Sequence, residues 1–185
     1  MSLTLPEVVS LLERRGHGQY GMEAISQLDH ALQCAHLAEQ SGETPETVVA
    51  ALLHDLGHLL VTERDQQTEQ YTQHDDLHQF IALPFLRSLF PEAVLEPIRL
   101  HVDAKRYLCL MEPSYWAHLS PASKHSLEKQ GGVFGEREAE AFISQPFASE
   151  SVRLRRYDDL AKVPAKVVPD LSHYNTHLQQ VALTA

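Results

Sequence analysis

The sequence has little cysteine and little positive charge. Its two cysteines, Cys34 and Cys109, are far apart and match no metal-binding or redox spacing, so both are expected to be small buried residues, with a thiol ligand or a disulfide as the alternative. Only 15 Lys and Arg residues stand against 25 Asp and Glu residues, which gives a formal net charge of -10. Affinity for the phosphate backbone of nucleic acid depends on clustered cations, so nucleic acid is not expected as a partner.

Long apolar runs are also missing. No segment approaches the roughly 20 uninterrupted apolar residues of a membrane span, and residues 1–6 lack the basic region and long apolar run of a signal peptide. We therefore expect a cytoplasmic location and no membrane partner. The 185 residues, 43% of them hydrophobic, suffice for one domain with its own core. Length and composition leave the oligomeric state open.

The period-2 alternation of β-strands is almost absent, so the sequence predicts an all-α fold. Helices are expected over 6–15, 23–40, from 45 through 58, from 75 to about 89, over 92–108, from 120, and over 136–143, 149–155 and 170–181. The polar residues 61–73 are expected to form a long connection, and the glycine-rich residues 16–21 a loop.

Histidine, by contrast, is abundant, with 12 in the chain. The apolar segment 50–60 contains His54, Asp55 and His58. Buried polar groups are costly unless they are paired, hydrogen-bonded or bound to a metal, and on a helix His58 would lie one turn after His54 on the same face. The segment therefore predicts a metal site that combines imidazole and carboxylate ligands.

Further candidate ligands lie on other predicted helices, as a metal site in the core of a helical bundle requires. The full candidate set is His30, His54, Asp55, His74 or His78, His101, and an aspartate at position 158 or 159. Imidazoles with carboxylates suit first-row transition metals, and the lack of cysteine ligands disfavours a structural zinc site. Six side chains, one of them a carboxylate that can bridge, indicate two metal ions. The spacing leaves iron, manganese, cobalt and zinc open.

His30, the His54-Asp55 pair and a late aspartate reproduce the signature of HD-domain metalloproteins, most of which are phosphohydrolases. The longer segments 20–30, 52–58, 101–108, 119–123 and 130–132 resemble the HD-domain mixed-valent diiron oxygenases of phosphonate breakdown, the PhnZ/TmpB-like group. Each motif alone is weak, but together and in this order they are specific. The resemblance implies one HD domain over 1–185, a helical bundle with a dinuclear metal site and a metal-binding core at about 20–160.

The same resemblance implies a ligand arrangement. Asp55 would bridge an Fe(II)/Fe(III) pair, with His30, His54 and Asp158 on one iron and His78 and His101 on the other. The spacing to Leu86 and Arg87 favours His78 over His74, and Asp159 is expected to be a solvated carboxylate.

The implied reaction is cleavage of the C-P bond of a 1-hydroxyphosphonate by O2, which gives phosphate and a carboxylate. The expected substrate is 1-hydroxy-2-(trimethylammonio)ethylphosphonate, which gives glycine betaine, or 2-amino-1-hydroxyethylphosphonate, which gives glycine, and the sequence leaves the substituent open. The side chains expected to bind the phosphonate are Lys105, His58, Ser123, Ser126, Gln130 and Arg155. Glu23 would face the cationic nitrogen of the substrate. Tyr20 would coordinate the iron that binds the substrate as long as no substrate is present. The expected catalytic side chains are Tyr20, Glu23, His58 and Lys105.

Two other function classes stay open on the residues alone. In an HD-type phosphohydrolase the same two metals would activate water against a small phosphate ester. In a metal-stabilised regulatory protein there would be no turnover. Without the resemblance, Tyr20 could simply pack on the bundle, Glu23 could face a helix dipole, and Lys105 could be a solvated charge. Oxygen dependence separates the oxygenase from both alternatives.

Overall fold

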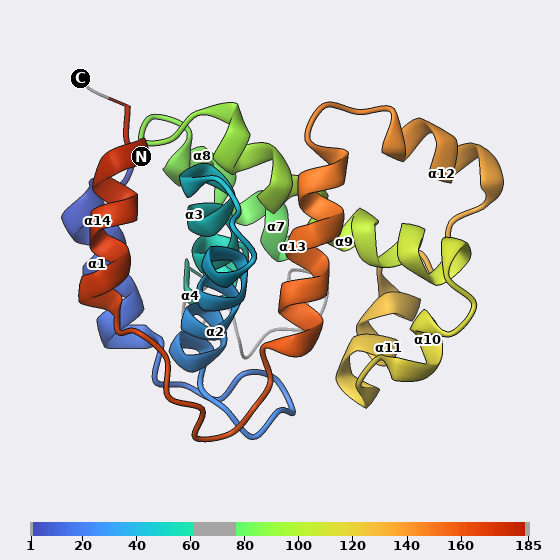
Figure 1. Ribbon diagram of the computed structural model, residues 1–185, viewed down its shortest axis with the longest axis horizontal. Helices are drawn as coiled ribbons and strands as arrows, with labels where there is room; N and C mark the ends of the chain where they lie inside the picture. Colours follow the sequence, from blue (N-terminus) through green and yellow to red (C-terminus); the bar gives the residue numbers. More distant parts are fainter. Residues whose placement is uncertain (1, 61–76, 184–185) are drawn as a thin grey trace.

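A computed structural model describes residues 2–60 and 77–183, and its regular structure is helical apart from a β-bridge between Gln19 and Ser26 (Figure 1). The predicted all-α class is confirmed. The helices are α1 (Leu5–Arg15), α2 (Gln27–Gln40), α3 (Pro45–Leu53), α4 (Leu56–Leu60), α7 (His78–Ile81), α8 (Leu83–Leu86), α9 (Glu92–Met111), α10 (Tyr115–His118), α11 (Pro121–Lys129), α12 (Glu136–Ile143), α13 (Ala148–Leu160) and α14 (Leu171–Val181). The connection expected over 61–73, the helix start expected at 75–76 and His74 lie outside the described residues.

Side-chain caps set several of these helix starts. Thr44 accepts a hydrogen bond from the backbone N-H of Thr47, and Pro45 occupies the first turn, as the sequence predicts. Ser26, Ser120 and Asp170 cap α2, α11 and α14 in the same way. Each such cap contributes about 1 kcal/mol, so the start points of these helices are encoded locally.

The packing has two parts that share α9 and α13 (Figure 1). The first part buries apolar side chains of α1, α2, α3, α4, α8, α13, α14 and the beginning of α9. The second packs α10, α11 and α12 on the later turns of α9. Because α9 has 20 residues and a helix rises about 1.5 Å per residue, it is long enough to run through both parts. Within the described ranges, no helix has the length and apolar character needed to cross a membrane.

Two predicted helices have different bounds in the structure. The helix expected over 23–40 begins only at Gln27, because residues 19–26 form a closed loop in which the Tyr20 N-H donates to the Ile25 carbonyl over 2.9 Å. Gly21 adopts a φ of 51° in that loop, which suits glycine. The helix expected over 149–155 extends to Leu160 as α13. The last turns of α13 are polar, which is not typical of a core helix. Their charged side chains form ion pairs between residues three and four positions apart.

The helix expected from 45 through 58 is interrupted at its most important point. α3 ends at Leu53, His54 and Asp55 form a turn, and α4 begins at Leu56. The His58 N-H donates to the Asp55 carbonyl over 3.0 Å, a three-residue spacing in place of the four-residue spacing of an α-helix. The prediction that one continuous helix carries both histidines is therefore wrong.

The segment expected as one helix from 75 to about 89 contains two short helices, α7 and α8. Pro84 lies in the first turn of α8, where its missing N-H is tolerated. Cys34 is buried as expected. Cys109 is only half-buried, because it lies at the edge of the apolar cluster around Leu108.

Candidate metal centre

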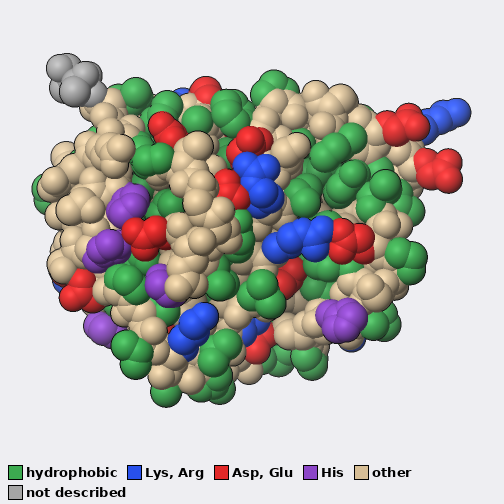
Figure 2. Space-filling model, viewed as in Figure 1, with side chains coloured by type: hydrophobic (Ala, Val, Ile, Leu, Met, Phe, Trp, Pro, Cys, Tyr) green, Lys and Arg blue, Asp and Glu red, His purple; other side chains and the backbone are tan. Residues whose placement is uncertain are grey.

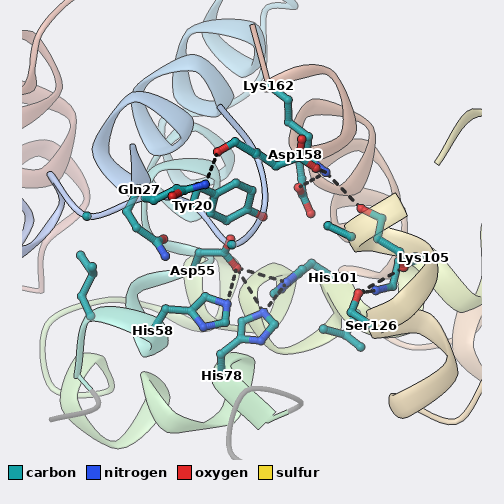
Figure 3. A pocket seen from close by; sticks show the side chains of 18 of the residues that line it. Tyr20, Gln27, Asp55, His58, His78, His101, Lys105, Ser126, Asp158 and Lys162 are labelled. Carbon is teal, nitrogen blue, oxygen red and sulfur yellow. Dashed lines mark hydrogen bonds and ion pairs between the residues drawn. The ribbon is translucent and has the colours of Figure 1, made fainter. Parts of the chain in front are cut away.

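Six of the predicted ligands meet in the centre of the bundle, and Figure 3 labels Asp55, His78, His101 and Asp158 among them. They are His30 from α2, His54 and Asp55 from the turn after α3, His78 from α7, His101 from α9 and Asp158 from α13. His30 and His54 have no exposed surface, and His101 is 1% exposed. Segments far apart in the sequence thus bring four imidazoles and two carboxylates to one buried point.

Asp55 lies between two pairs of histidines. Its Oδ2 atom is 3.4 Å from His54 Nε2 and 3.7 Å from His30 Nε2. Its Oδ1 atom is 3.1 Å from His78 Nε2 and 3.8 Å from His101 Nε2. One carboxylate therefore presents a separate oxygen to each pair, which is the geometry that a bridging ligand needs.

Backbone carbonyls orient three of the rings. The carbonyl oxygens of Ala161, Ala51 and Ile98 lie 2.8, 2.9 and 2.7 Å from the Nδ1 atoms of His30, His54 and His101, respectively. A carbonyl can only accept a hydrogen bond, so each Nδ1 carries a hydrogen and donates it. In a neutral ring the lone pair is then on Nε2, which faces the cluster. Ligand histidines in metalloproteins are oriented in this way.

The donor atoms are crowded in a way that a cation would relieve. His30 Nε2 and His54 Nε2 are 3.4 Å apart, and His78 Nε2 and His101 Nε2 are 3.0 Å apart. Asp158 Oδ1 is buried without a hydrogen-bond partner among the described residues. Unsatisfied buried acceptors are costly. The set fits two transition-metal ions, which His30, His54 and Asp158 on one side and His78 and His101 on the other could hold, with Asp55 between them.

The pKa shifts agree with a site that needs positive charge. Burial lowers the pKa of His30 to about 4, so this ring is neutral at pH 7 and ready to bind a metal. Burial acts in the same direction on His54, but the Asp55 carboxylate overcomes it and raises the pKa of His54 to about 9. A proton on His54 then balances Asp55, and a metal ion would take the place of that proton.

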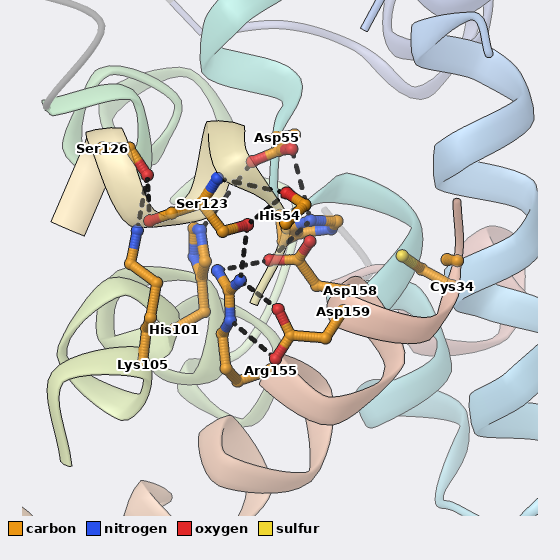
Figure 4. A network of polar contacts seen from close by, with 12 residues as sticks. Cys34, His54, Asp55, His101, Lys105, Ser123, Ser126, Arg155, Asp158 and Asp159 are labelled. Carbon is orange, nitrogen blue, oxygen red and sulfur yellow. Dashed lines mark hydrogen bonds and ion pairs between the residues drawn. The ribbon is translucent and has the colours of Figure 1, made fainter. Parts of the chain in front are cut away.

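Arg155 is committed to the carboxylates of α13 (Figure 4). Its Nη1 is 2.7 Å from Asp158 Oδ2, and its Nη2 forms an ion pair with Asp159. Its Nε donates to the Tyr115 hydroxyl over 3.2 Å, and that hydroxyl donates to Asp159. Asp159 is therefore no solvated carboxylate: its side chain is 19% exposed and paired. Arg155 faces the cavity, but its contacts make it the group that positions Asp158.

A cavity of about 690 Å³ opens beside the cluster. The predicted site residues that line it are Tyr20, Glu23, Asp55, His58, His78, His101, Lys105, Ser123, Ser126, Gln130, Arg155 and Asp158. His30 and His54 do not line it. The sequence reading missed further lining residues, which include Arg15, Gln19, Gln27 and Lys162. Lys162 was detectable, because it is a cation only four residues after Asp158 in the sequence.

Two ammonium groups and two hydroxyls form one side of this cavity. Lys105 is 2% exposed, and its Nζ donates to Ser126 Oγ over 2.7 Å. Burial lowers the pKa of Lys105 to about 7, and the nearby Arg155 acts in the same direction. Lys162 Nζ donates to Ser123 Oγ over 3.0 Å and is 3.9 Å from Glu23 Oε1. This side can therefore bind an anion with several donors.

Tyr20 and His58 lie against ligand rings. The Tyr20 ring stacks on His30 with 3.9 Å between centroids, and the His58 ring stacks on His78 with 4.2 Å. Burial raises the pKa of the Tyr20 hydroxyl, with Asp158 and Asp55 acting in the same direction. His58 Nε2 is 3.9 Å from Asp55 Oδ1, so His58 is also within reach of a metal at this position.

One cysteine, expected from the sequence as a small buried residue, adjoins the cluster. Cys34 Sγ is 3.7 Å from His30 Nε2, and the two residues are one turn apart on α2. Burial raises the pKa of the Cys34 thiol, so it is protonated at neutral pH. The four-residue spacing from His30 was the sequence signal for this neighbour.

The position of His78 depends on Gly57, which leads to a first prediction. A Cβ atom at Gly57 would lie 2.0 Å from the His78 carbonyl oxygen, so Gly57→Ala must push α7 away from α4. We expect a loss of about 1–3 kcal/mol in stability, as for other overpacked sites, together with a lower metal content. Urea unfolding and metal analysis measure both.

Gly135→Ala is the matched control, since a Cβ there would make only ordinary contact at 3.5 Å. If Gly57→Ala had the stability and metal content of the parent, α7 could move away from α4 without cost. The proposal that close packing at Gly57 fixes the position of His78 would then be wrong.

Comparison with known proteins gives the family. Residues 28–131 match the model of the HD domain. The chain is 46% identical over 174 residues to hydroxymethylphosphonate dioxygenase of Gimesia maris, which covers 93% of this chain and 86% of that protein. It is 34% identical over 171 residues to [1-hydroxy-2-(trimethylamino)ethyl]phosphonate dioxygenase (glycine-betaine-forming) of Leisingera caerulea. This alignment covers 92% of this chain and 86% of that protein. The chain therefore belongs to the HD-domain family, within its group of phosphonate dioxygenases.

Proposed function

We propose that this chain holds an Fe(II)/Fe(III) pair and uses O2 to cleave the C-P bond of a 1-hydroxyphosphonate, giving phosphate and a carboxylate. The observation that carries the proposal is the Asp55 carboxylate, whose two oxygens face separate histidine pairs beside a cation-lined cavity. The similarity to the two relatives, both named as phosphonate dioxygenases, supports it.

The relatives differ in what the hydroxyl-bearing carbon carries. One is named for hydroxymethylphosphonate and the other for a trimethylamino-substituted ethylphosphonate. We take both as candidate substrates for this chain, along with 2-amino-1-hydroxyethylphosphonate. Their carboxylate products would be formate, glycine betaine and glycine. Oxygen and substrate combine one to one, since both atoms of O2 are needed to form the carboxylate and the phosphate.

The iron pair, when bound, supplies the redox chemistry with O2 that protein side chains lack. The side chains of the cavity bind and orient the substrate. Lys105 with Ser126, and Lys162 with Ser123, would donate to phosphonate oxygens. The Glu23 carboxylate, which lies 3.9 Å from Lys162 Nζ, would attract the cationic nitrogen of a substituted substrate.

Oxygen dependence tests this proposal. Protein reconstituted with Fe(II) is supplied with each candidate hydroxyphosphonate, and oxygen uptake and phosphate release are followed together. We expect equal amounts of oxygen consumed and phosphate released. Phosphate release from a phosphate ester without oxygen would instead support the phosphohydrolase alternative.

A cytoplasmic location, one domain over 1–185 and the absence of nucleic-acid partners stay predictions from the sequence.

The charge of Lys105 gives a second prediction. Its pKa of about 7 means that the ammonium form, which binds an anion, is lost as the pH rises through 7. The value of kcat/KM, which reports groups of the free enzyme, should therefore fall above about pH 7. In Lys105→Gln we expect kcat/KM to be roughly 10- to 100-fold lower and this decline to disappear, since a charge-assisted hydrogen bond contributes about 1.5–3 kcal/mol.

Lys129→Gln removes an exposed lysine of α11 outside the cavity and serves as the control. A Lys105→Gln protein with the parental kcat/KM and pH profile would remove Lys105 from substrate binding.

Tyr20 gives a third prediction. Tyr20→Phe keeps the ring that stacks on His30 and deletes the hydroxyl. If that hydroxyl guards the substrate position at rest, the variant should bind iron normally but lose its mixed-valent signal faster in air without substrate. Electron paramagnetic resonance measures the decay. Equal decay in the parent and in Tyr20→Phe would rule out the guarding role.

A further inference from the structure

A second group of side chains of the types that bind metals joins α2 and α14, outside the cavity. It consists of Glu39 on α2 and of His173 and His177 on α14, and their donor atoms all lie within 4.8 Å of one another. Glu39 is nine residues beyond His30 on α2, or about 13 Å along the helix axis. Figure 2 shows histidine side chains (purple) next to an acidic side chain (red) on the face where α14 runs. We call this group the α14 cluster.

His173 Nε2 and Glu39 Oε1 are at hydrogen-bond distance, and the three donor atoms of the α14 cluster are close enough together to bind one cation. His173 and His177 are four residues apart, so they share one face of α14. Their Nε2 atoms lie 2.8 and 3.5 Å from the same oxygen, Glu39 Oε1. Donors bound to one tetrahedral Zn²⁺ at about 2.0–2.1 Å are about 3.3–3.4 Å apart. The distance from His177 Nε2 to Glu39 Oε1 is within about 0.2 Å of this separation, and the distance from His173 Nε2 must lengthen by about half an ångström.

Neighbouring groups hold two of the three donors. The buried Tyr174 hydroxyl donates to Glu39 Oε2 over 3.4 Å, which leaves Oε1 to face the histidines. Thr176 Oγ1 is 3.5 Å from His177 Nδ1, the ring nitrogen that does not face Glu39. Such contacts with the outer atoms of ligands are typical of metal sites. An exposed ion pair would contribute little stability and would need only one histidine.

We propose that Glu39, His173 and His177 form an exchangeable binding site for a divalent cation of the Zn²⁺ type, separate from the metal centre in the bundle. Two imidazoles and one carboxylate suit Zn²⁺, and solvent supplies the remaining ligands because the His173 side chain is 43% exposed. The bound ion links α14 to α2, the helix that carries His30. Zinc therefore stabilises the fold without taking part in the reaction.

The test uses protein reconstituted with iron, titrated with ZnCl2 and followed by calorimetry, thermal unfolding and iron analysis. We expect one zinc ion per chain to bind beyond the iron, without iron release. At a 100-fold excess of free zinc over its Kd, the Tm should rise by about 5–10 °C. His177→Gln and Glu39→Gln should each weaken zinc binding at least about 10-fold and abolish the rise in Tm.

His125→Gln is the matched control, because His125 is an exposed histidine of α11 outside the α14 cluster. It should bind zinc as the parent does. The His177→Gln protein must keep its iron, which shows that it is folded. Undiminished zinc binding by His177→Gln, zinc uptake only with release of iron, or no additional zinc in the parent would each overturn the proposal.

Discussion

Asp55→Ala is expected to lose both metal ions and not one. The Asp55 carboxylate presents Oδ2 to His54 and His30 and Oδ1 to His78 and His101, so its removal takes a donor from each side at once. Loss of groups that only orient a ligand costs about 10- to 100-fold in metal affinity or activity. Loss of a shared ligand should therefore lower activity by at least about 100-fold. Metal analysis after gel filtration, together with oxygen uptake, measures both effects.

Asp103→Ala is the control for this change. Asp103 is a carboxylate of α9 that pairs with Arg106 and does not line the cavity. Its replacement should leave the metal content unchanged. Two tightly held ions in each Asp55→Ala chain would show that Asp55 is not shared.

Arg155→Met should destabilise the metal-free protein by about 3–5 kcal/mol, the usual result of removing one partner from a buried ion pair. Methionine keeps much of the side-chain length, but it leaves the carboxylates of Asp158 and Asp159 without the cation that both contact. For a domain of this size the loss corresponds to a fall of about 6–20 °C in Tm. Urea and thermal unfolding of metal-free protein measure it.

The next residue provides a matched control. Arg156 forms an ion pair with Glu112, and its side chain is 45% exposed. Arg156→Met should cost no more than about 1 kcal/mol, as exposed pairs do. If Arg155→Met left stability unchanged and raised only KM, Arg155 would be a substrate ligand, as the sequence reading expected, and its positioning role would be wrong.

Most of the helices could be predicted because their signals are local. Thr44 with Pro45, and Ser120 with Pro121, mark starts that depend only on neighbouring residues. The break at His54 and Asp55 could not be predicted, because a turn closed over three residues and a helix closed over four are compatible with the same apolar pattern. The closed loop over 19–26 was hidden for a similar reason, since its hydrogen bonds are between backbone groups.

The contacts of the site needed the tertiary structure. The spacing of Arg155, Asp158 and Asp159 places them on neighbouring faces of one helix, yet only the fold brings in Tyr115, which is 40 positions away from Arg155. That distant hydroxyl is why Asp159 is paired and not solvated. The burial of Lys105 likewise depends on α11, which contributes Ser126 to its contact.

The backbone acceptors behind the ligand rings affect how the chain tolerates change. Because His30 donates to the carbonyl of Ala161 and not to a side chain, substituting Ala161 leaves the acceptor in place. The same is true of Ala51 behind His54 and Ile98 behind His101. Inserting or deleting a residue between Asp158 and Ala161, however, would move the carbonyl away from the ring and release its orientation. The protonation pattern of the ligands is thus robust to point substitution and vulnerable to changes in loop or helix length.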